Sequence, residues 1–339
     1  MDVPVLILFG PTASGKTAVL LNLFGGGKAC PRRAEIISAD SMQVYRGMDI
    51  GTAKPSTGEQ ALLPHHLIDI RDPNEQFNAG DFVRLAGEAC IDIARRGKLP
   101  VISGGTGFYL KNFIMGLPEA PPADLAIRAR LKADLQVRGA GVLMEELASG
   151  DPVSARRIHI NDEYRMLRAL EVLRLTGRPL SSFQASGASA GNPARYRFLV
   201  AGLSRPREEL YRRINLRTAA MFRQGLPGEV RKLYEAGYTP RDPGLRAIGY
   251  REFFTGDTGA SLPEETCWRF AVDCAGVEEL VARNSRRYAK RQITFFAAIP
   301  GVEWIEAGPD DTVTAEKIRR RLDAFLQEEP DRAPGDIVP

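Results

Sequence analysis

The chain has few cysteines and histidines and no long apolar run. Its four cysteines, Cys30, Cys90, Cys267 and Cys274, include no Cys-x-x-Cys pair, which argues against a zinc site or a disulfide framework and indicates reduced thiols. No apolar stretch approaches the ~20 residues that a transmembrane helix needs, and the N-terminus lacks the basic region of a signal peptide. We therefore expect a cytosolic protein that does not contact a membrane.

What the chain does have is an ordinary globular composition and an uneven charge. Its 339 residues are 44% hydrophobic and 26% charged, and the length predicts two lobes. The net charge is only +4, yet residues 195–299 contain 19 Lys and Arg against 12 Asp and Glu. Such an excess either attracts a polyanion or forms a solvated surface, and the composition alone leaves both interpretations open.

The most informative motif lies near the N-terminus and matches the phosphate-loop pattern G-x-x-x-x-G-K-[ST]. In such a loop, backbone N–H groups and the start of the next helix surround an oxyanion, and Lys16 adds a full positive charge. Thr17 is the expected Mg²⁺ ligand. The residues predicted to bind a phosphate or diphosphate are Gly10, Pro11, Thr12, Ala13, Ser14, Gly15, Lys16 and Thr17. Kinases, NTPases and diphosphate-using transferases share this loop, so it does not identify the substrate.

Residues 1–111 alternate between strand and helix patterns. Strands are predicted at 5–9, 35–38, 66–70 and 99–103, with helices at 16–24 and from Asn78, as the N-cap, to about Gly97. The alternation predicts an α/β fold with a doubly wound, parallel sheet of the P-loop NTPase type. Ligands gather at the carboxyl ends of parallel strands, so the phosphate loop, Asp40 and the segment 104–106 should line one cleft.

Prolines after residue 117 interrupt this pattern, and a helical segment follows. We predict a helical insertion domain at 112–195, in which 181–192 form a loop. Strands at 197–203 and 302–305 and helices at 207–223 and 315–327 follow it. The P-loop core should therefore comprise 1–111 and 196–310, with a C-terminal helical part, and residues 330–339 should be a disordered tail.

One helix predicted in the later half carries five cations at steps of three and four, with no acidic residue among them. They are Arg283, Arg286, Arg287, Lys290 and Arg291. Val277, Val281 and Tyr288 occupy another face, so the helix can dock with its basic face outward. Because unpaired cations on one face repel each other, contact with a nucleic-acid backbone is favoured over a merely solvated surface.

Several stretches, read together, resemble the tRNA dimethylallyltransferase family over about residues 5–305. Beside the phosphate loop they are Ser38-Ala-Asp-Ser-Met-Gln-Val-Tyr-Arg-Gly-Met-Asp-Ile-Gly-Thr-Ala-Lys-Pro55, Pro64-His-His-Leu-Ile-Asp69, Gly104-Gly-Thr-Gly-Phe-Tyr109, Arg246-Ala-Ile-Gly-Tyr-Arg251 and Ala289-Lys-Arg-Gln292. The resemblance implies transfer of a dimethylallyl group from its diphosphate to N6 of the adenosine immediately 3′ of the anticodon, in tRNAs that read codons beginning with U. The chain departs from the family at Phe295-Phe296, where a Trp is common.

The resemblance also implies roles for individual residues. Asp40 would take the proton from the N6 amine, while Ser41, Met42 and Gln43 seat the flipped base. Thr106 would lie near the reacting atoms, and Arg217 would clamp the leaving diphosphate. Positions that match tRNA contacts are Arg128, Tyr164, Arg165, Met166, Leu167, Arg168, Arg246, Gly249, Tyr250 and Arg251, to which the basic helix adds Arg286, Arg287 and Lys290.

The expected partners are the anticodon stem-loop of tRNA and dimethylallyl diphosphate, with Mg²⁺ as cofactor and a monomeric enzyme. The alternatives are an adenylate isopentenyltransferase of the cytokinin type, a P-loop small-molecule kinase and a nucleotide-switched RNA binder. The helical insertion and the basic helix argue against an enzyme for mononucleotides. Whether Asp40 also orders a water on Mg²⁺ stays open at this point, because an acid beside a phosphate loop often does.

Overall fold

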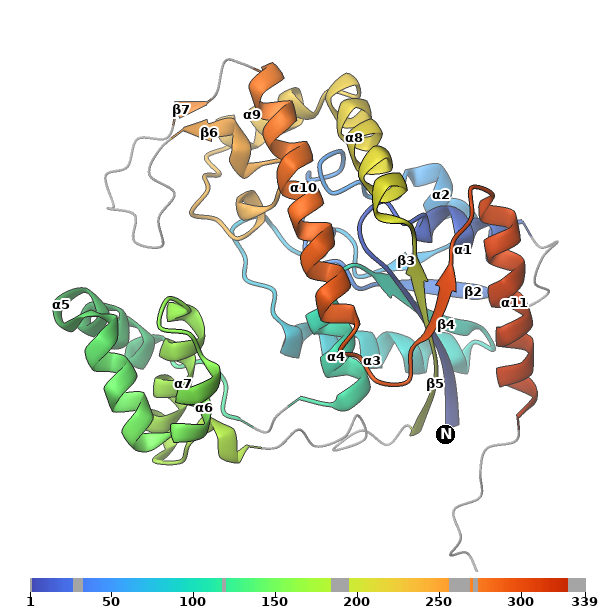
Figure 1. Ribbon diagram of the computed structural model, residues 1–339. Helices are drawn as coiled ribbons and strands as arrows, with labels where there is room; N and C mark the ends of the chain where they lie inside the picture. The colour runs from blue at the N-terminus through green and yellow to red at the C-terminus, as the bar shows by residue number, and fades with distance from the viewer. Residues whose placement is uncertain are drawn as a thin grey trace, which may run out of the picture. The chain divides into compact units, whose positions relative to one another are not determined.

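The computed structural model describes residues 2–26, 33–117, 120–183, 195–255, 269–270 and 274–328 (Figure 1). The chain divides into two compact units, Met1–Phe113 with Asn192–Pro339, and Ile114–Gly191. We call the first the sheet unit and the second the helical unit. The predicted tail at 330–339 and most of the predicted loop at 181–192 lie outside the described residues.

The sheet unit is built on six parallel strands in the order β3-β2-β4-β1-β5-β8. They are β1 (Asp2–Phe9), β2 (Ala34–Ser38), β3 (His65–His66), β4 (Leu99–Gly104), β5 (Arg195–Ser204) and β8 (Glu303–Glu306). In the register, Leu6 of the central β1 lies between Val101 and Leu199. The predicted α/β fold with a parallel, doubly wound sheet is confirmed.

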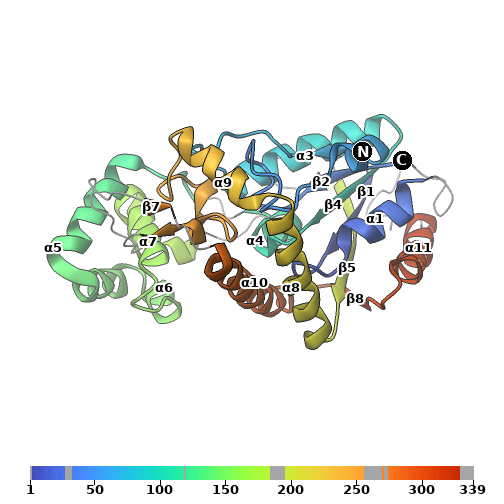
Figure 2. The ribbon, with the colours of Figure 1, turned by 90° about the horizontal axis from the view of Figure 1, so that it is seen from above.

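Alternate residues of the strands face two different layers of helices. Leu6 and Leu8 of β1 pack with helices α1 (Lys16–Phe24) and α11 (Asp311–Gln327) on one face. On the other face lie α3 (Ala79–Arg95) and α4 (Gly107–Met115), where the ring of Phe113 is 6.0 Å from that of Phe198 (Figure 2). Both faces are covered, which explains why the strands read as continuous apolar runs.

Most predicted boundaries agree within about two residues, and the larger departures are at the start of β1, at β3 and at the start of α11, which begins at Asp311 and not at residue 315. Helices α1 and α8 (Arg207–Arg223) have the predicted bounds, and the Asn78 side chain caps α3 through the N–H groups of Gly80 and Asp81. The strand predicted at 66–70 is wrong beyond residue 66, because Leu67 and Asp69 adopt left-handed φ values of 62° and 56°.

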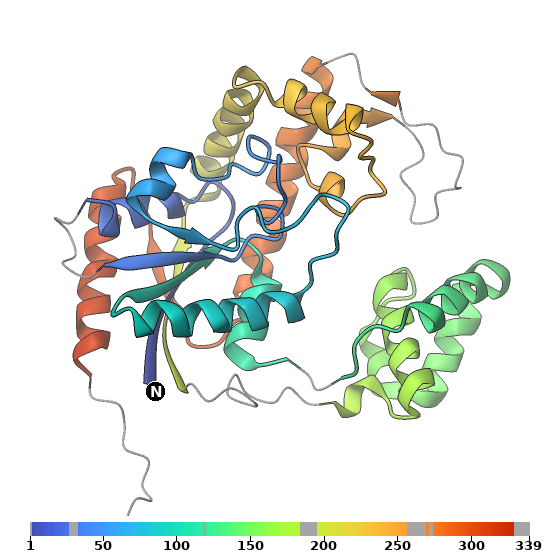
Figure 3. The same ribbon diagram turned by 180° about the vertical axis from the view of Figure 1, so that it is seen from behind.

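The remaining described elements of this unit surround the carboxyl end of the sheet (Figure 3). They are the helices α2 (Thr57–Leu62), α9 (Leu226–Glu235) and α10 (Cys274–Phe296), the 3-10 turns Gly244–Arg246 and Arg251–Phe253, and the antiparallel pair β6 (Phe254–Thr255) and β7 (Arg269–Phe270). Leu210 and Ile214 of α8 pack against Ala289 of α10. At the end of α10, Phe296 is fully buried with its ring 4.6 Å from that of Phe9, so one of the two phenylalanines at which the chain departs from the family pattern is a core residue.

The helical unit has a small core of its own. Its elements are α5 (Leu125–Gly150), α6 (Pro152–Arg157), α7 (Glu163–Thr176) and the turn Leu180–Ser182, and α5 is kinked at Gly139, where φ is 80°. The fully or nearly fully buried residues at its centre are Leu131, Leu143, Leu147, Met166, Leu167, Ala169 and Leu170. The buried Asp151 accepts hydrogen bonds from Ser154 and Ser181 and so connects the start of α6 to the turn Leu180–Ser182, which follows α7.

Candidate active site

The three segments predicted to line one cleft do meet at the carboxyl edge of the sheet. The phosphate loop follows β1, Asp40 follows β2 and Thr106 follows β4. The Thr106 N–H donates to the carbonyl of Ala39 at 3.0 Å, and the Thr106 hydroxyl accepts from the Ser41 N–H at 2.9 Å. Hydrogen bonds therefore join the end of β4 directly to the segment that carries Asp40.

These segments border a cavity of about 800 Å³ in the sheet unit. From the phosphate loop, Thr12, Ala13, Gly15, Lys16 and Thr17 line it, and from the predicted acceptor side Asp40, Ser41, Met42 and Gln43 do so. The later half of the chain contributes Arg212, Arg213, Arg217, Arg246, Arg251, Ser285, Tyr288, Arg291 and Gln292 among others. Eight lining residues are Lys or Arg and two are acidic, so the cavity attracts an anion.

The phosphate loop has the turn that its glycine and small residues predict. Ala13 and Gly15 have φ values of 63° and 100°, and α1 begins at Lys16. The Lys16 ammonium donates to the carbonyls of Gly10 and Pro11 at 2.9 and 3.0 Å. Burial, helped by the nearby charge of Arg217 and opposed by that of Asp40, lowers the pKa of Lys16 to about 8. A bound anion would offset this unfavourable positive environment.

Arginines from the C-terminal half of the chain donate hydrogen bonds to oxygen atoms of the phosphate loop. The Arg213 Nε donates to the carbonyl of Ala13 at 3.0 Å, and an Arg217 Nη lies 3.4 Å from the hydroxyl of Thr12. Arg205, which is buried, donates to the carbonyl of Ser14 at 2.7 Å. The Arg217 guanidinium therefore lies at the loop, as predicted, and two further arginines that had no predicted role support the loop backbone.

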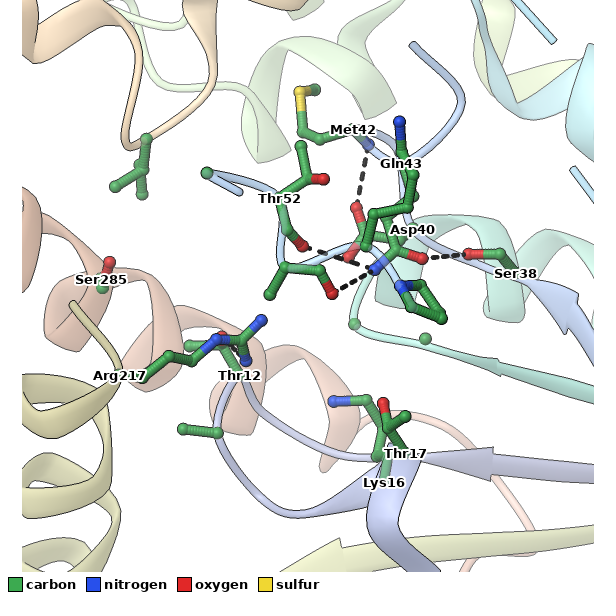
Figure 4. A pocket seen from close by; sticks show the side chains of 18 of the residues that line it. Thr12, Lys16, Thr17, Ser38, Asp40, Met42, Gln43, Thr52, Arg217 and Ser285 are labelled. Carbon is green, nitrogen blue, oxygen red and sulfur yellow. Dashed lines mark hydrogen bonds between the residues drawn. The ribbon is translucent and has the colours of Figure 1, made fainter. Parts of the chain in front are cut away.

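Opposite the loop, the acceptor side is held by hydrogen bonds within its own segment. One carboxylate oxygen of Asp40 accepts from the Met42 N–H at 2.9 Å. The amide oxygen of Gln43 accepts from the Ser38 hydroxyl at 2.9 Å, and its nitrogen lies 3.4 Å from the carbonyls of Thr52 and Ala53. Figure 4 shows these residues across the cavity from Thr12, Lys16, Thr17 and Arg217.

Glu229 of α9 is a functional candidate that the sequence did not reveal. Its carboxylate accepts the consecutive N–H groups of Asp49, Ile50 and Gly51 at 3.0, 2.8 and 3.1 Å. It also accepts the hydroxyl of Tyr250 at 2.6 Å. A side chain at position 51 would collide with the Tyr250 ring. Tyr250, predicted to contact tRNA, is fully buried, so its observed role is to support this loop.

The basic helix has the orientation that its pattern predicts. Val277 and Val281 of α10 are buried, while Arg287 and Lys290 are exposed and have no ion-pair partner among the described residues. Arg286, by contrast, is half-buried, and its guanidinium donates to the Asn215 side chain at 2.5 Å. Arg291 is exposed and lines the cavity.

Of the other predicted tRNA contacts in the sheet unit, Arg246 and Arg251 line the cavity. Gly249 lies beside them in a left-handed conformation, with φ of 97°. Its N–H donates to Glu252 at 2.9 Å, so this segment is also held by a carboxylate.

In the helical unit, the predicted tRNA contacts divide into a surface group and a core group. Arg128 pairs with the buried Glu171 at 2.7 Å and lies over the exposed ring of Tyr164, 5.9 Å from its centroid. Arg168 lies 3.4 Å from the same carboxylate, and Arg165 is an exposed residue paired with Asp162. The predicted contacts Met166 and Leu167 are buried in the core, so their side chains pack the unit and offer no surface to RNA.

The fold and the cavity define a P-loop α/β protein with a site for an anionic substrate. A family model described as IPP transferase matches residues 43–298. A tRNA dimethylallyltransferase of Geobacter sulfurreducens is 46% identical over 304 residues, which are 89% of this chain and 91% of that protein. The chain therefore belongs to the tRNA dimethylallyltransferase family, and the predicted family and enzyme class are confirmed.

Solved structures agree with this assignment. The crystal structure of a full-length tRNA isopentenylpyrophosphate transferase from Bacillus halodurans is 36% identical and has a TM-score of 0.63, covering 95% of this chain and 96% of that one. A eukaryotic dimethylallyltransferase acting on tRNA, 24% identical with a TM-score of 0.76 over 97% and 80% of the two chains, supports the fold. Within the described residues no helix has the length and apolarity to cross a membrane, and no group of three or more His, Cys, Asp or Glu is arranged to bind a metal.

Proposed function

We propose that this enzyme transfers the dimethylallyl group of dimethylallyl diphosphate to N6 of the adenosine immediately 3′ of the anticodon, in tRNAs that read codons beginning with U. The observation that carries the proposal is one basic cavity with a phosphate loop on one side and Asp40, held by the Met42 N–H, on the other. A donor diphosphate and an acceptor base can therefore meet in one site.

Catalysis on the donor side is electrostatic. As the allylic carbon–oxygen bond breaks, negative charge develops on the diphosphate, and preorganised cations at that point lower the barrier. Lys16 and Arg217 line the cavity beside Thr12, and Arg213 fixes the carbonyl of Ala13. We assign to Lys16 and Arg217 the stabilisation of the leaving diphosphate and to Arg213 the shape of the loop.

On the acceptor side the weak nucleophile is the exocyclic amine of adenine. A new carbon–nitrogen bond forms at N6 as the carbon–oxygen bond breaks, and one N6 proton must leave. Asp40 takes this proton, a role worth typically 10²- to 10⁴-fold in rate. Ser41, Met42 and Gln43 line the cavity next to it, and we assign them to the base that has left its stack.

Thr106 acts beside these groups through Ser41. Its hydroxyl accepts the Ser41 N–H at 2.9 Å and lies 3.3 Å from the Ser41 hydroxyl, but Thr106 is not among the residues that line the cavity. Its place in the proposed mechanism is therefore to hold the acceptor segment. Its hydroxyl also interacts with that of Tyr288, which lines the cavity, so the closeness of Thr106 to the reacting atoms stays a prediction.

Mg²⁺ is part of the proposal, and the oxygen groups present fit it. The Thr17 hydroxyl belongs to an exposed residue that lines the cavity beside Lys16. Mg²⁺ prefers oxygen ligands and usually keeps several waters beside the substrate phosphates, so the Thr17 hydroxyl would hold it together with the diphosphate and water. When bound there, the ion would neutralise part of the diphosphate charge. Asp40 borders the same cavity, so it can also hold a water of that ion.

The macromolecular partner in the proposal is the anticodon stem-loop of tRNA, bound by a monomer in the cytoplasm. The exposed cations of α10 and the pair formed by Arg128 and Tyr164 support it, because RNA binding uses phosphate contacts and aromatic rings on which bases stack. Phosphate contacts position the RNA, and the cavity selects the base.

The experiment that tests this function is mass analysis of tRNA after incubation with dimethylallyl diphosphate and Mg²⁺, with AMP offered as acceptor in a parallel reaction. A gain of one dimethylallyl group at the adenosine 3′ of the anticodon is expected, with no modified AMP. Modification of AMP alone would identify an adenylate isopentenyltransferase instead, and turnover of ATP without prenyl transfer would identify a kinase.

A further inference from the structure

Gln292 on α10 is a buried side chain that bonds to both sides of the cavity. Only 5% of its surface is exposed. Its amide oxygen accepts the N–H of Thr12 in the phosphate loop at 2.9 Å. Its amide nitrogen donates to the carbonyl of Gly105, after β4, at 2.7 Å. One side-chain amide therefore bridges the loop that follows β1 and the loop that follows β4.

This bridge requires the chemistry of glutamine. The end near Thr12 must accept a proton and the end near Gly105 must donate one, so only one orientation of the amide satisfies both. A glutamate would place an oxygen against the Gly105 carbonyl, and a methionine of similar length would make neither bond. A Cβ at position 105 would lie 2.5 Å from the Gln292 nitrogen, so the approach also requires glycine there.

The Gly105 end of the bridge is fixed to the segment that carries Asp40. The next residue, Thr106, donates its N–H to the Ala39 carbonyl at 3.0 Å and accepts the Ser41 N–H at 2.9 Å. Gly104 packs so closely on Ala39 that a Cβ there would lie 2.1 Å from the Ala39 carbonyl oxygen. A shift of Gly105 would therefore move the acceptor side of the cavity.

Resting on the proposed function, we infer that Gln292 is a positioning residue that sets the separation between the diphosphate loop and the acceptor segment. The transfer needs the allylic carbon and N6 at about 3 to 3.5 Å and in line, and a misplacement of about 1 Å costs about 10²-fold in rate. Both polar ends of Gln292 bond to backbone groups, and the amide also interacts with the Tyr288 hydroxyl, so Gln292 acts through these groups and not on the reacting atoms.

The first test is Gln292→Met, which keeps the side-chain length and removes the hydrogen bonds of the amide, including the two to the loops. We expect kcat for transfer to fall about 10- to 100-fold, while the Kd for inorganic diphosphate and the Kd for tRNA stay within about three-fold of the parent. Gln292→Glu should not rescue kcat. Thr294→Val is the matched control, because Thr294 is exposed on the same helix and, within the described part of the chain, its hydroxyl bonds only to the Lys290 carbonyl of that helix.

The second test approaches the bridge from Gly105. Gly105→Ala should displace the amide and lower kcat in the same way, whereas in Gln292→Ala the added methyl group enters vacated space. The double variant should therefore be no slower than Gln292→Ala alone. Additive losses, a parental kcat in Gln292→Met, or a diphosphate affinity lost in proportion to kcat would each overturn the inference.

These outcomes are separate from failure of the proposed function. The parent enzyme is measured first with both acceptors, and kcat of each variant is read with the acceptor that the parent uses. If the parent modified AMP and not tRNA, the proposed function would be wrong, and the kcat of Gln292→Met on AMP would still decide the role of Gln292.

Discussion

The pKa of Lys16 makes diphosphate binding sensitive to pH at the scale of one residue. Burial lowers this pKa from 10.5 to about 8, so the ammonium is charged below about pH 8 and loses its proton above it. We expect the affinity for dimethylallyl diphosphate to fall as pH rises from 7 to 9.5, because the neutral amine no longer attracts phosphate. Calorimetric titration across this range measures the effect.

Lys16→Arg is the control for that titration. A guanidinium stays charged over the whole range, so the affinity of this variant should change little with pH. The same slope in parent and variant would show that the pH dependence belongs to the ligand or to another group of the cavity.

Asp40→Asn tests the general base. The amide keeps the shape and can still accept the Met42 N–H, but it cannot take a proton from N6. We expect kcat to fall by about 10² to 10⁴, with the Kd for tRNA within a few-fold of the parent, since the carboxylate acts in the transition state. Single-turnover kinetics at saturating substrates measure this. Glu59→Gln, which removes the other negative charge of the cavity, should turn over like the parent.

At the scale of secondary-structure elements, α9 fixes a loop within residues 38–55, one of the stretches that resemble the tRNA dimethylallyltransferase family. Glu229 accepts three consecutive N–H groups and the Tyr250 hydroxyl, so Glu229→Gln places an amide N–H against at least one donor. Because a hydrogen bond to a charged group is worth about 1.5 to 3 kcal/mol, we expect the free energy of unfolding to fall by about that amount in urea titrations.

The same variant should also affect function on one side of the cavity only. Thr52 and Ala53 follow this loop and accept from Gln43, so the KM for tRNA should rise while the Kd for diphosphate stays unchanged. Glu235→Gln is the control, an exposed glutamate at the end of the same helix. Loss of diphosphate binding in Glu229→Gln alone would mean that the carboxylate supports the whole unit and not this segment.

Helix α10 should position tRNA through the exposed Arg287 and Lys290 and the half-buried Arg286. Replacing Arg286, Arg287 and Lys290 with Gln removes up to three phosphate contacts, and each contact contributes roughly 0.7 to 0.9 to the slope of log K against log salt. We expect weaker tRNA binding and a slope flatter by about two units, measured by filter binding at several salt concentrations.

A control with the same loss of charge comes from α11, where Lys317, Arg320 and Arg321 are exposed. The triple Gln variant at these positions should keep the parental slope. If the two triple variants lost affinity equally, net charge and not the α10 surface would account for the binding.

At the scale of the whole molecule, the sequence predicted what depends on local order along the chain. Alternating strands and helices placed the phosphate loop, Asp40 and Thr106 at one sheet edge. The sequence did not predict contacts between distant residues, such as those of Glu229 with Gly51 and of Gln292 with Thr12. Nothing local marks such partners, because the pairs are 178 and 280 residues apart.

Single-residue burial was equally hard to predict inside matched motifs. Met166, Leu167 and Tyr250 lie in stretches that match tRNA contacts, yet all three are buried. The motif marks a segment near the RNA, and the helical period then decides which of its side chains face the core. The prediction of a strand at 66–70 was wrong because Leu67 and Asp69 adopt left-handed backbone conformations that end the strand. Neither residue is a glycine, so nothing in the sequence indicated these conformations.

The helical unit supplies the last prediction, because it presents an exposed aromatic ring in the part of the chain that we assign to tRNA. Tyr164 is 73% exposed and lies beside the Arg128 guanidinium. Stacking of a base on an aromatic ring is worth about 1 to 3 kcal/mol, so Tyr164→Ala should weaken tRNA binding about five-fold or more. Diphosphate affinity should not change, since the cavity is built from the sheet unit alone.

Fluorescence titration with an anticodon stem-loop measures the effect of Tyr164→Ala. The control is Val137→Ala, at an exposed apolar residue of α5. Equal affinity of both variants for the stem-loop would remove Tyr164 from the RNA contact and leave phosphate contacts as the contribution of this unit.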